Sequence, residues 1–505
     1  MIINANVYKD RVYACFTGKN IGGTVGFPFE FVRQANVIDG YDESLSFPMP
    51  NDDLDLQLLW LIALEEKGCR LDATLLEEYW QRYLTPHWSE YGVSKINMRT
   101  GVQAPMSGTV NNGQYKHSNG AWIRSEIWAC LCPGMPQWAA SLAVEDAILD
   151  HGNGEGVWGE VFCAAMQSIA FVQTDAVKLV EQALAFISQD TGLHRAICDA
   201  LDCYRSGLSL AEARDRMLTL HRGQYGRSCS PEDLAKGFDS GPIGYDCPLN
   251  VAIVALGLLY GEGDFDKMIR STIYFGEDTD CTVGTAAATF GLMYGTAAID
   301  PKWSAPIGDK ITVGTLNLGE LGIYGDVLPQ TVPELTERIY RQHRIFAIQN
   351  GQNSAAEGID TEAIRPQDLV PDGRFLDQIR RRISCQQFRF DFYTVLVDYV
   401  SEDCHIEKGV PRTVKITVRS EYKTADVLNF RWLLPEGITV SPVKEGRFFL
   451  QLGGFRDGSD AKELTFTFLS ECEQMTARCV LELTIDGRTT TMYVPVLFLG
   501  GHGEL

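Results

Sequence analysis

The sequence lacks any run of about 18 consecutive apolar residues, so it predicts no transmembrane helix. Its first ten residues do not combine a basic stretch with a following apolar stretch, and we therefore expect no secretory leader. Positive charge is also scarce, because 44 Lys and Arg stand against 66 Asp and Glu and the net charge is −22. A field of that sign repels nucleic-acid phosphates and acidic membrane surfaces, so neither is an expected partner.

The 14 cysteines of this 505-residue chain show no disulfide or zinc framework. Cys130 and Cys132 are separated by one residue rather than the two that are common in zinc sites, and no second Cys or His pair matches them. Reduced and mostly buried thiols in a cytoplasmic protein are the arrangement we expect.

The hydrophobic pattern divides the chain into two parts. Over residues 1–348 apolar side chains recur at helical spacing, which predicts an all-α domain. Residues 349–385 are polar and rich in Gly, Asn, Ser and Pro, as is typical of a linker. From 386 to 505 the pattern changes to alternation, and about seven runs rich in β-branched and aromatic residues predict an antiparallel β-sandwich of the immunoglobulin type.

One stretch inside the helical part has a different composition. Residues 91–117 are rich in Gly, Asn and Ser, and we predict a long loop there. A long structureless segment within a compact domain is often functional.

Acidic residues precede two of the predicted helices. Asn51-Asp52-Asp53 comes before one apolar helix, and Glu277, Asp278 and Asp280 come before the small-residue helix at 283–291. Helix capping explains one acid at each start. Carboxylates from two helix starts are also the oxygen ligands that Mg²⁺ or Mn²⁺ requires. The residues alone leave capping and metal binding open.

The segment from Asp10 to Glu30 is predicted as a helix with glycines on one face, broken at Pro28. Glycine costs helix propensity, so its recurrence predicts that another backbone approaches this face closely. A phosphate-binding loop is not indicated, because no strand precedes the segment and no Gly-Lys-Ser/Thr ends it.

Taken in order, these motifs resemble the ADP-ribosylglycohydrolase family. The resemblance covers residues 8 to about 345 and rests on Gly18-x-x-x-Gly22-Gly23-x-x-Gly26-x-Pro28-x-Glu30, Asn51-Asp52-Asp53, Asn119-Gly120-Ala121-x-Ile123-Arg124, Asp150-His151 and Gly276-x-Asp278-Thr279-Asp280. It implies an all-helical domain that holds two divalent cations, Mg²⁺ or Mn²⁺. The implied reaction is hydrolysis of a glycosidic bond to ADP-ribose, carried on a protein side chain or on a small conjugate.

The resemblance also implies roles for individual residues. The metal ligands would be Asn51, Asp52, Asp53, Asp278, Asp280 and Cys281, and the catalytic carboxylates would be Glu30, Asp53 and Asp280. The family usually has Thr where this chain has Asn51, and often Thr where it has Cys281. An Asn still offers a carbonyl oxygen. A thiol is a poor ligand for a hard ion, so the Thr282 hydroxyl or a water is the alternative ligand.

The substrate would be bound by the segment whose residues are Asn119, Gly120, Ala121, Ile123 and Arg124, together with His151. Peptide N–H groups at a helix start suit a pyrophosphate. Arg124 could equally pair with a neighbouring carboxylate, and His151 could be a structural hydrogen-bonding residue. A rival interpretation of the whole chain is a non-catalytic sensor of ADP-ribose or a nucleotide on the same scaffold.

Overall fold

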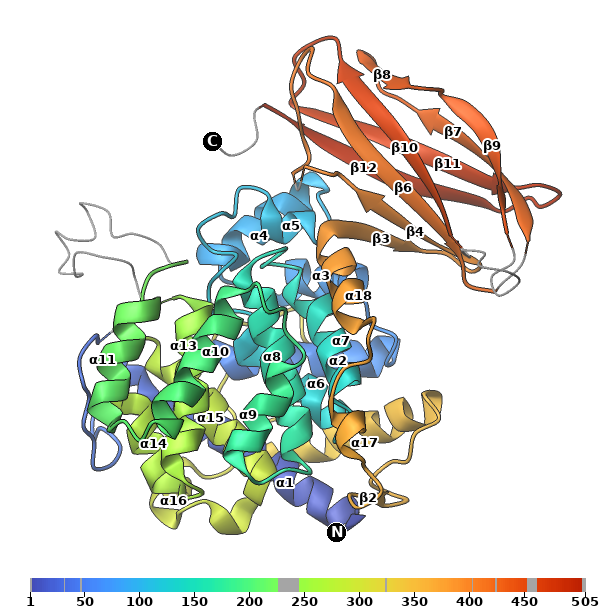
Figure 1. Cartoon of the computed structure of the whole chain (residues 1–505). Coiled ribbons are helices and arrows are strands. Elements are labelled where there is room, and N and C mark those ends of the chain that lie inside the picture. Colours follow the sequence, from blue (N-terminus) through green and yellow to red (C-terminus); the bar gives the residue numbers. More distant parts are fainter. Residues whose placement is uncertain are drawn as a thin grey trace.

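The computed structural model describes residues 2–30, 32–45, 48–225, 245–322, 325–401, 403–422, 425–451 and 461–501. A helical domain is followed by a sandwich of two β-sheets, which lies at one end of the helical domain (Figure 1). The predicted fold class, all-α and then all-β, is confirmed.

The helical domain is built from helices that surround a continuous buried core. Its α-helices are α1 (Ala5–Gly26), α2 (Asp52–Lys67), α3 (Ala73–Tyr83), α4 (Ser89–Thr100), α5 (Met106–Thr109), α6 (Glu126–Leu131), α7 (Pro136–Ala147), α8 (Glu155–Ala170), α9 (Ala176–Leu184), α10 (Gly192–Arg205), α11 (Leu210–His221), α13 (Cys247–Gly261), α14 (Phe265–Tyr274), α15 (Thr279–Tyr294), α16 (Pro301–Ile307) and α17 (Val332–Gln349). Short 3₁₀ helices are η1 (Phe27–Phe29), η2 (Trp122–Arg124) and η3 (Thr296–Ala298). None of the helices in the described part of the chain has the length and low charge that a membrane span needs.

The loop predicted over residues 91–117 is wrong for its first part, which forms α4. This helix buries polar side chains by bonding them to backbone carbonyls of other segments. Asn97 donates to Ser107 O at 2.8 Å and to Val110 O at 2.7 Å, and Lys95 donates to Leu84 O at 2.7 Å. Such burial depends on tertiary partners, so hydrophobic periodicity does not reveal it.

Helices α1 and α15 pack with their backbones in contact, as the glycines predicted. A Cβ atom at Gly18 would lie 2.4 Å from Ala287 O, and one at Gly22 would lie 2.4 Å from Gly284 Cα. Gly26 is equally close to the first turn of α15. The next glycine, Gly23, faces α2 instead, and a Cβ there would lie 2.0 Å from Asn51 Nδ2. Neighbouring glycines of α1 therefore contact the start of α2, at Gly23, and the start of α15, at Gly26.

The sandwich has more strands than the seven predicted runs. One sheet has the order β3-β4-β6-β10-β8 and the other has the order β5-β12-β11-β7-β9. The strands are β3 (Cys385–Arg389), β4 (Tyr393–Asp398), β5 (His405–Ile406), β6 (Arg412–Ser420), β7 (Asp426–Leu433), β8 (Ile438–Ser441), β9 (Glu445–Leu450), β10 (Ala461–Ser470), β11 (Thr476–Ile485) and β12 (Thr491–Gly500). The sequence missed β5 and β8, because two and four residues are too few for an alternating pattern, and it merged β3 and β4 into one run.

Part of the sandwich has immunoglobulin-type connectivity: β4-β6-β10-β8 and β7-β11-β12 correspond to strands A-B-E-D and C-F-G. Strands β3, β5 and β9 are additional to that pattern, and β9 lies beside β7 although it follows β8 in the chain. Trp432 on β7 is fully buried and makes edge contacts with Phe466 and Phe468, at centroid separations of 5.1 and 4.9 Å. A buried Trp on strand C, the position of β7, is a hallmark of these sandwiches.

The segment between the domains is structured along the surface. Strand β2 (Ile359–Asp360) pairs with β1 (Ile2–Ile3), and η4 (Pro366–Leu369) and α18 (Phe375–Ser384) lead into β3. Arg382 on α18 makes a two-pronged ion pair with Glu145 on α7, at 2.7 and 2.8 Å, and both side chains are largely buried. The segment that leads into the sandwich is thus fixed to the helical domain by a buried ion pair.

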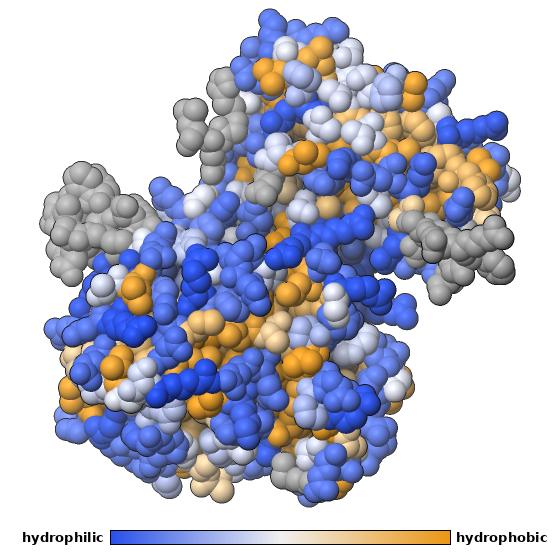
Figure 2. Space-filling model, in the orientation of Figure 1, coloured by the Kyte–Doolittle hydropathy of each residue, from blue (hydrophilic) through white to orange (hydrophobic). Residues whose placement is uncertain are grey.

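The two domains also share apolar contacts. Val102, Met106 and Val110, from the segment around α5, belong to the same buried cluster as the sandwich interior. On the face shown in Figure 2, hydrophilic residues cover most of both domains, and hydrophobic residues gather on part of the sandwich and in the middle of the helical domain.

The contact between α1 and α15 generates the first prediction. Gly22→Ala should lower the free energy of unfolding by about 3 kcal/mol or more, because the added methyl would meet backbone atoms that cannot rotate away. Chemical denaturation measures this loss. Gly40→Ala is the matched control, since a Cβ at Gly40 meets nothing within 4 Å. Equal stability of the two variants would contradict the packing described here.

Candidate metal centre

The start of α2 separates capping from its acidic residues. Asn51 is the N-cap, and its Oδ1 accepts a hydrogen bond from Asp53 N at 2.7 Å. Asp52 and Asp53 follow inside the first turn, and Asp53 is completely buried. Because Asn51 already caps the helix, capping does not account for the two aspartates.

The start of α15 shows the same separation. Gly276 and Glu277 adopt positive φ angles of 74° and 70°, which turn the chain into the helix. Asp278 occupies the N-cap position, yet its side chain makes no capping hydrogen bond. Its Oδ2 accepts from Asn119 Nδ2 at 2.6 Å, while its Oδ1 is buried without a hydrogen-bond partner. The buried Oδ1 of Asp280 also has none.

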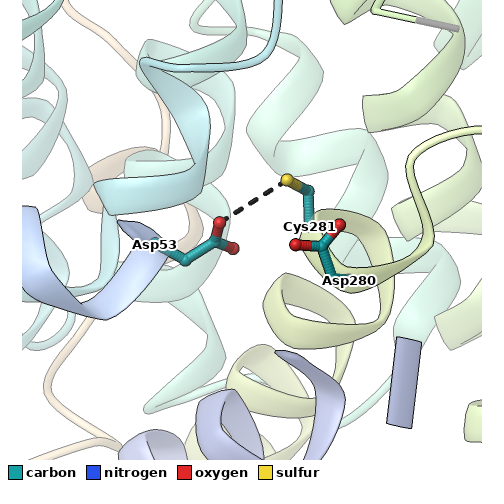
Figure 3. A group of neighbouring side chains, drawn as sticks. All are labelled: Asp53, Asp280 and Cys281. Carbon is teal, nitrogen blue, oxygen red and sulfur yellow. Dashed lines mark hydrogen bonds between the residues drawn. The ribbon is translucent and has the colours of Figure 1, made fainter. Parts of the chain in front are cut away.

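The two helix starts and the end of η1 bring five of the predicted site residues together. Ligand atoms of Asp53, Asp280 and Cys281 all lie within 4.8 Å of one another, and those of Glu30, Asp278 and Asp280 form a second such group. Figure 3 shows Asp53 reaching from α2 towards Asp280 and Cys281 on α15. Asp280 belongs to both groups, so the two form one continuous acidic centre.

A buried lysine borders this centre, and the sequence analysis did not identify it. Lys19 Nζ on α1 lies 3.1 Å from Asp53 Oδ2, 3.0 Å from Glu126 Oε1 and 3.0 Å from Thr285 Oγ1. Its side chain is 1% exposed. One sequence feature could have indicated it: Lys19 lies in the glycine-rich part of α1, where a lysine is not expected to be buried unless an anion lies beside it.

The pKa values of the acidic centre are raised in the metal-free protein. Burial, followed by repulsion from Asp280 and Asp52, raises the pKa of Glu30 to about 9. Burial and Asp280 raise the pKa of Asp52 to about 7. Burial raises the pKa of Asp53 to about 8, although Lys19 lowers it. The pKa of Asp278 lies well above its ordinary value, first through burial and then through Asp280.

These groups fit a divalent cation. They supply hard oxygen atoms from several helices, and two of those atoms are buried without hydrogen-bond partners. A cation would relieve the repulsion that holds the pKa values high, since opposite charge favours the ionised carboxylate.

Asp52 and Glu277 lie differently from the other acids. Asp52 is partly exposed and its Oδ2 accepts a hydrogen bond from Tyr91 at 3.2 Å. Glu277 is buried and pairs with Arg222 at 2.6 Å. Neither residue belongs to the two ligand groups within 4.8 Å.

The residues predicted to bind the substrate lie in the interior, behind the acidic centre. All are buried, and Asn119 holds Asp278 while accepting from Trp122 Nε1 at 3.0 Å. The buried set is Asn119, Gly120, Ala121, Ile123, Arg124 and His151. Asn119 thus positions one acidic residue of the centre, and contact of these buried residues with a substrate stays a prediction.

Arg124 and His151 share one carboxylate, the alternative that the sequence left open for Arg124. Arg124 lies 2.9 Å from both Asp146 Oδ1 and Asp150 Oδ1 and stacks over Trp80 at 4.9 Å. His151 Nδ1 lies 2.9 Å from the same Asp150 oxygen, and its Nε2 lies 3.2 Å from Ser118 Oγ. The two fully buried ion pairs of Arg124, with Asp146 and Asp150, fix the direction of its guanidinium group.

Known proteins resemble the helical part of the chain. A family model described as ADP-ribosylglycohydrolase matches residues 4–343. No protein in the curated set matches the chain. Among solved structures, a chain of an ADP-ribosylglycohydrolase-related protein complex is 18% identical, with 66% of this chain and 99% of that chain covered and a TM-score of 0.40.

Two further solved structures are more distant. A FixG-related protein from Vibrio parahaemolyticus is 11% identical, with 22% of this chain and 98% of that chain covered and a TM-score of 0.17. The alkylpurine DNA glycosylase AlkC of Pseudomonas fluorescens is 14% identical, with 67% and 98% covered and a TM-score of 0.13. Structural likeness this low carries no argument, whereas the family match spans most of the chain and includes both acidic helix starts. The chain belongs to the ADP-ribosylglycohydrolase family.

Proposed function

We propose that the protein is a metal-dependent hydrolase that cleaves a glycosidic bond to ADP-ribose. The observation that carries this proposal is the pair of ligand groups that share Asp280, in a family of glycohydrolases that act on ADP-ribosylated substrates. Neither helix start needs its aspartates as caps, so a ligand role is the simplest account of their burial.

The centre would hold two divalent cations, Mg²⁺ or Mn²⁺. Asp53, Asp278 and Asp280 would be the principal protein ligands, with Asp52 and Asn51 at the edge of the site and Cys281 beside Asp53. When bound, such ions orient hydroxyl groups of the ribose and activate a water molecule.

The protein's own groups would act on charge and on protons. A glycosidic bond breaks through an oxocarbenium-like transition state, whose positive charge is stabilised by nearby carboxylates. Glu30 is the one member of the two groups that is partly exposed, so it is placed to accept a proton from water. Asn119 keeps Asp278 in position through its 2.6 Å hydrogen bond.

The rival function is a sensor that binds ADP-ribose or a nucleotide without cleaving it. The features that favour it are Asn51 and Cys281, which stand where the family usually or often has Thr. Substrate could be an ADP-ribosylated protein or a small conjugate in either case. Tight binding of ADP-ribose without release of product from any linkage, in the presence of Mg²⁺ or Mn²⁺, would favour the sensor.

The hydrolase proposal predicts that Asp278→Asn combined with Asp280→Asn weakens metal binding at least about 100-fold, because two ligand charges are lost. Release of ADP-ribose from arginine-, serine- and acetyl-linked substrates should fall with it. Equilibrium dialysis and product analysis measure the two effects. The matched control is Asp215→Asn combined with Asp377→Asn, which removes two charges from side chains that are 82% and 81% exposed. Full metal binding and turnover in the first double variant would contradict the proposal.

The raised pKa values predict how stability depends on pH. With a chelator present, the folded protein keeps protons on Glu30, Asp52 and Asp53 up to about pH 7–9. The unfolded chain releases these protons near the ordinary carboxyl pKa values of 4.5 for Glu and 3.8 for Asp. The folded state therefore binds more protons in this interval, and stability falls as pH rises from about 4 to about 9.

The melting temperature of the metal-free protein, measured between pH 5 and 9, checks this sign. Glu30→Gln should show a shallower decline, because one of the raised groups is removed. Saturating Mg²⁺ or Mn²⁺ should raise the melting temperature more at pH 9 than at pH 6, since the ions bind the ionised carboxylates. A melting temperature that is equally pH-dependent in both proteins would show that Glu30 does not lie in a repulsive carboxylate group.

A further inference from the structure

The two ligand groups of the acidic centre differ in one donor atom. Glu30, Asp278 and Asp280 offer oxygen alone, whereas Asp53, Asp280 and Cys281 offer two carboxylates and a sulfur. Oxygen ligands suit Mg²⁺, Ca²⁺ and Mn²⁺, and thiolate ligands favour softer ions such as Zn²⁺. The donor atoms therefore influence which cation each ligand group would prefer.

The sulfur atom faces into the ligand group. Cys281 Sγ lies 3.5 Å from Asp53 Oδ1, and the dashed line in Figure 3 marks this contact. Lys19 lies 3.1 Å from the other oxygen, Oδ2, so Oδ1 is the atom of Asp53 left for the thiol side. Two ligands of one tetrahedral ion, with bonds of about 2.3 Å to sulfur and about 2.1 Å to oxygen, are about 3.6 Å apart.

A second observation points to a ligand at the same place. Asp280 is 8% exposed, and its Oδ1 is buried without a hydrogen-bond partner. An unpaired carboxylate oxygen beside another carboxylate is costly unless a cation binds there. The Cys281 thiol therefore belongs to a ligand group in which one carboxylate oxygen, Asp280 Oδ1, has no hydrogen-bond partner.

Thr282 is the residue whose hydroxyl the sequence offered as an oxygen ligand in place of the thiol. Thr282 Oγ1 donates to Thr279 O at 3.4 Å, within the first turn of α15, and its side chain is fully buried. Cys281 Sγ, by contrast, contacts Asp53 Oδ1 directly.

We propose that Asp53, Asp280 and Cys281 form a thiolate-containing position that prefers a thiophilic divalent cation such as Zn²⁺ or Co²⁺. The oxygen-only group of Glu30, Asp278 and Asp280 keeps the preference for Mg²⁺ or Mn²⁺. Binding at the first position replaces the S–H bond by a metal–sulfur bond and releases one proton to solvent. This inference rests on the proposed function for the existence of a paired metal centre, and it adds that the two positions are chemically unequal.

Cobalt titration of the metal-free full-length protein tests the inference without measuring activity. A sulfur ligand gives Co²⁺ a charge-transfer absorption in the near ultraviolet, which oxygen ligands do not give. The wild-type protein should show this band, and Cys281→Thr should lose it while still binding cobalt. Cys203→Ala, which removes another fully buried thiol outside the centre, should keep the band.

Competition with Mg²⁺ provides a second readout. Mg²⁺ in excess should displace one of two bound cobalt ions from the wild-type protein and leave the charge-transfer band, whereas it should displace both from Cys281→Thr. Cys281→Ala repeats the test in case the threonine variant does not fold, with circular dichroism as the check on folding.

The possible failures differ from one another. Cobalt binding without a charge-transfer band, or a band that persists in folded Cys281→Thr or Cys281→Ala, would overturn the thiolate ligand and leave the hydrolase proposal intact. Absence of any binding of Co²⁺, Mg²⁺ or Mn²⁺ by the wild-type protein would overturn both.

Discussion

The contact between α1 and α15 is the constraint on which the rest of the site depends. Gly18 and Gly22 allow the two backbones to touch, and a single added methyl would meet backbone atoms at 2.4 Å. The same helix receives Asn51 against Gly23, which sets the start of α2. Residues separated by more than two hundred positions are thereby held within one ligand group. Glycine's cost in helix propensity is offset by this close packing.

That packing gathers like charges in the interior, where they repel one another. Lys19 balances the negative charge of Asp53 and Glu126 on one side of the centre. Asn119 donates a hydrogen bond to one oxygen of Asp278. Nothing in the described structure does the same for Asp280 Oδ1. Strongly perturbed carboxylates that remain partly unpaired are typical of functional sites, because folding alone gains nothing from them.

The sequence predicted much of this site because the relevant residues mark helix starts and close approaches. Asp53, Asp278 and Asp280 converge as predicted, and Glu30 joins them. Lys19 was missed because a buried lysine is recognised by its partners, and those are distant in sequence.

Arg124 shows a different limit of the sequence. A motif position locates its segment, while Asp146 and Asp150 decide where its guanidinium points. In the same way α4 was missed because its buried polar side chains bond to carbonyls of other segments. The sequence could not predict the partner of each buried polar side chain, because that partner comes from a segment distant in the sequence.

The sandwich is connected to the site through α5 rather than through the linker alone. Met106 and Val110 belong to the sandwich core, while Gly108 between them packs so closely on Gly152 that a Cβ would lie 2.3 Å from its backbone nitrogen. Asn112 continues the connection by donating to Asp150 O at 2.7 Å. Asp150 is the carboxylate that both Arg124 and His151 contact. Contacts through α5 therefore extend from the sandwich core to the segment that carries Asp150, in addition to the covalent link through α18.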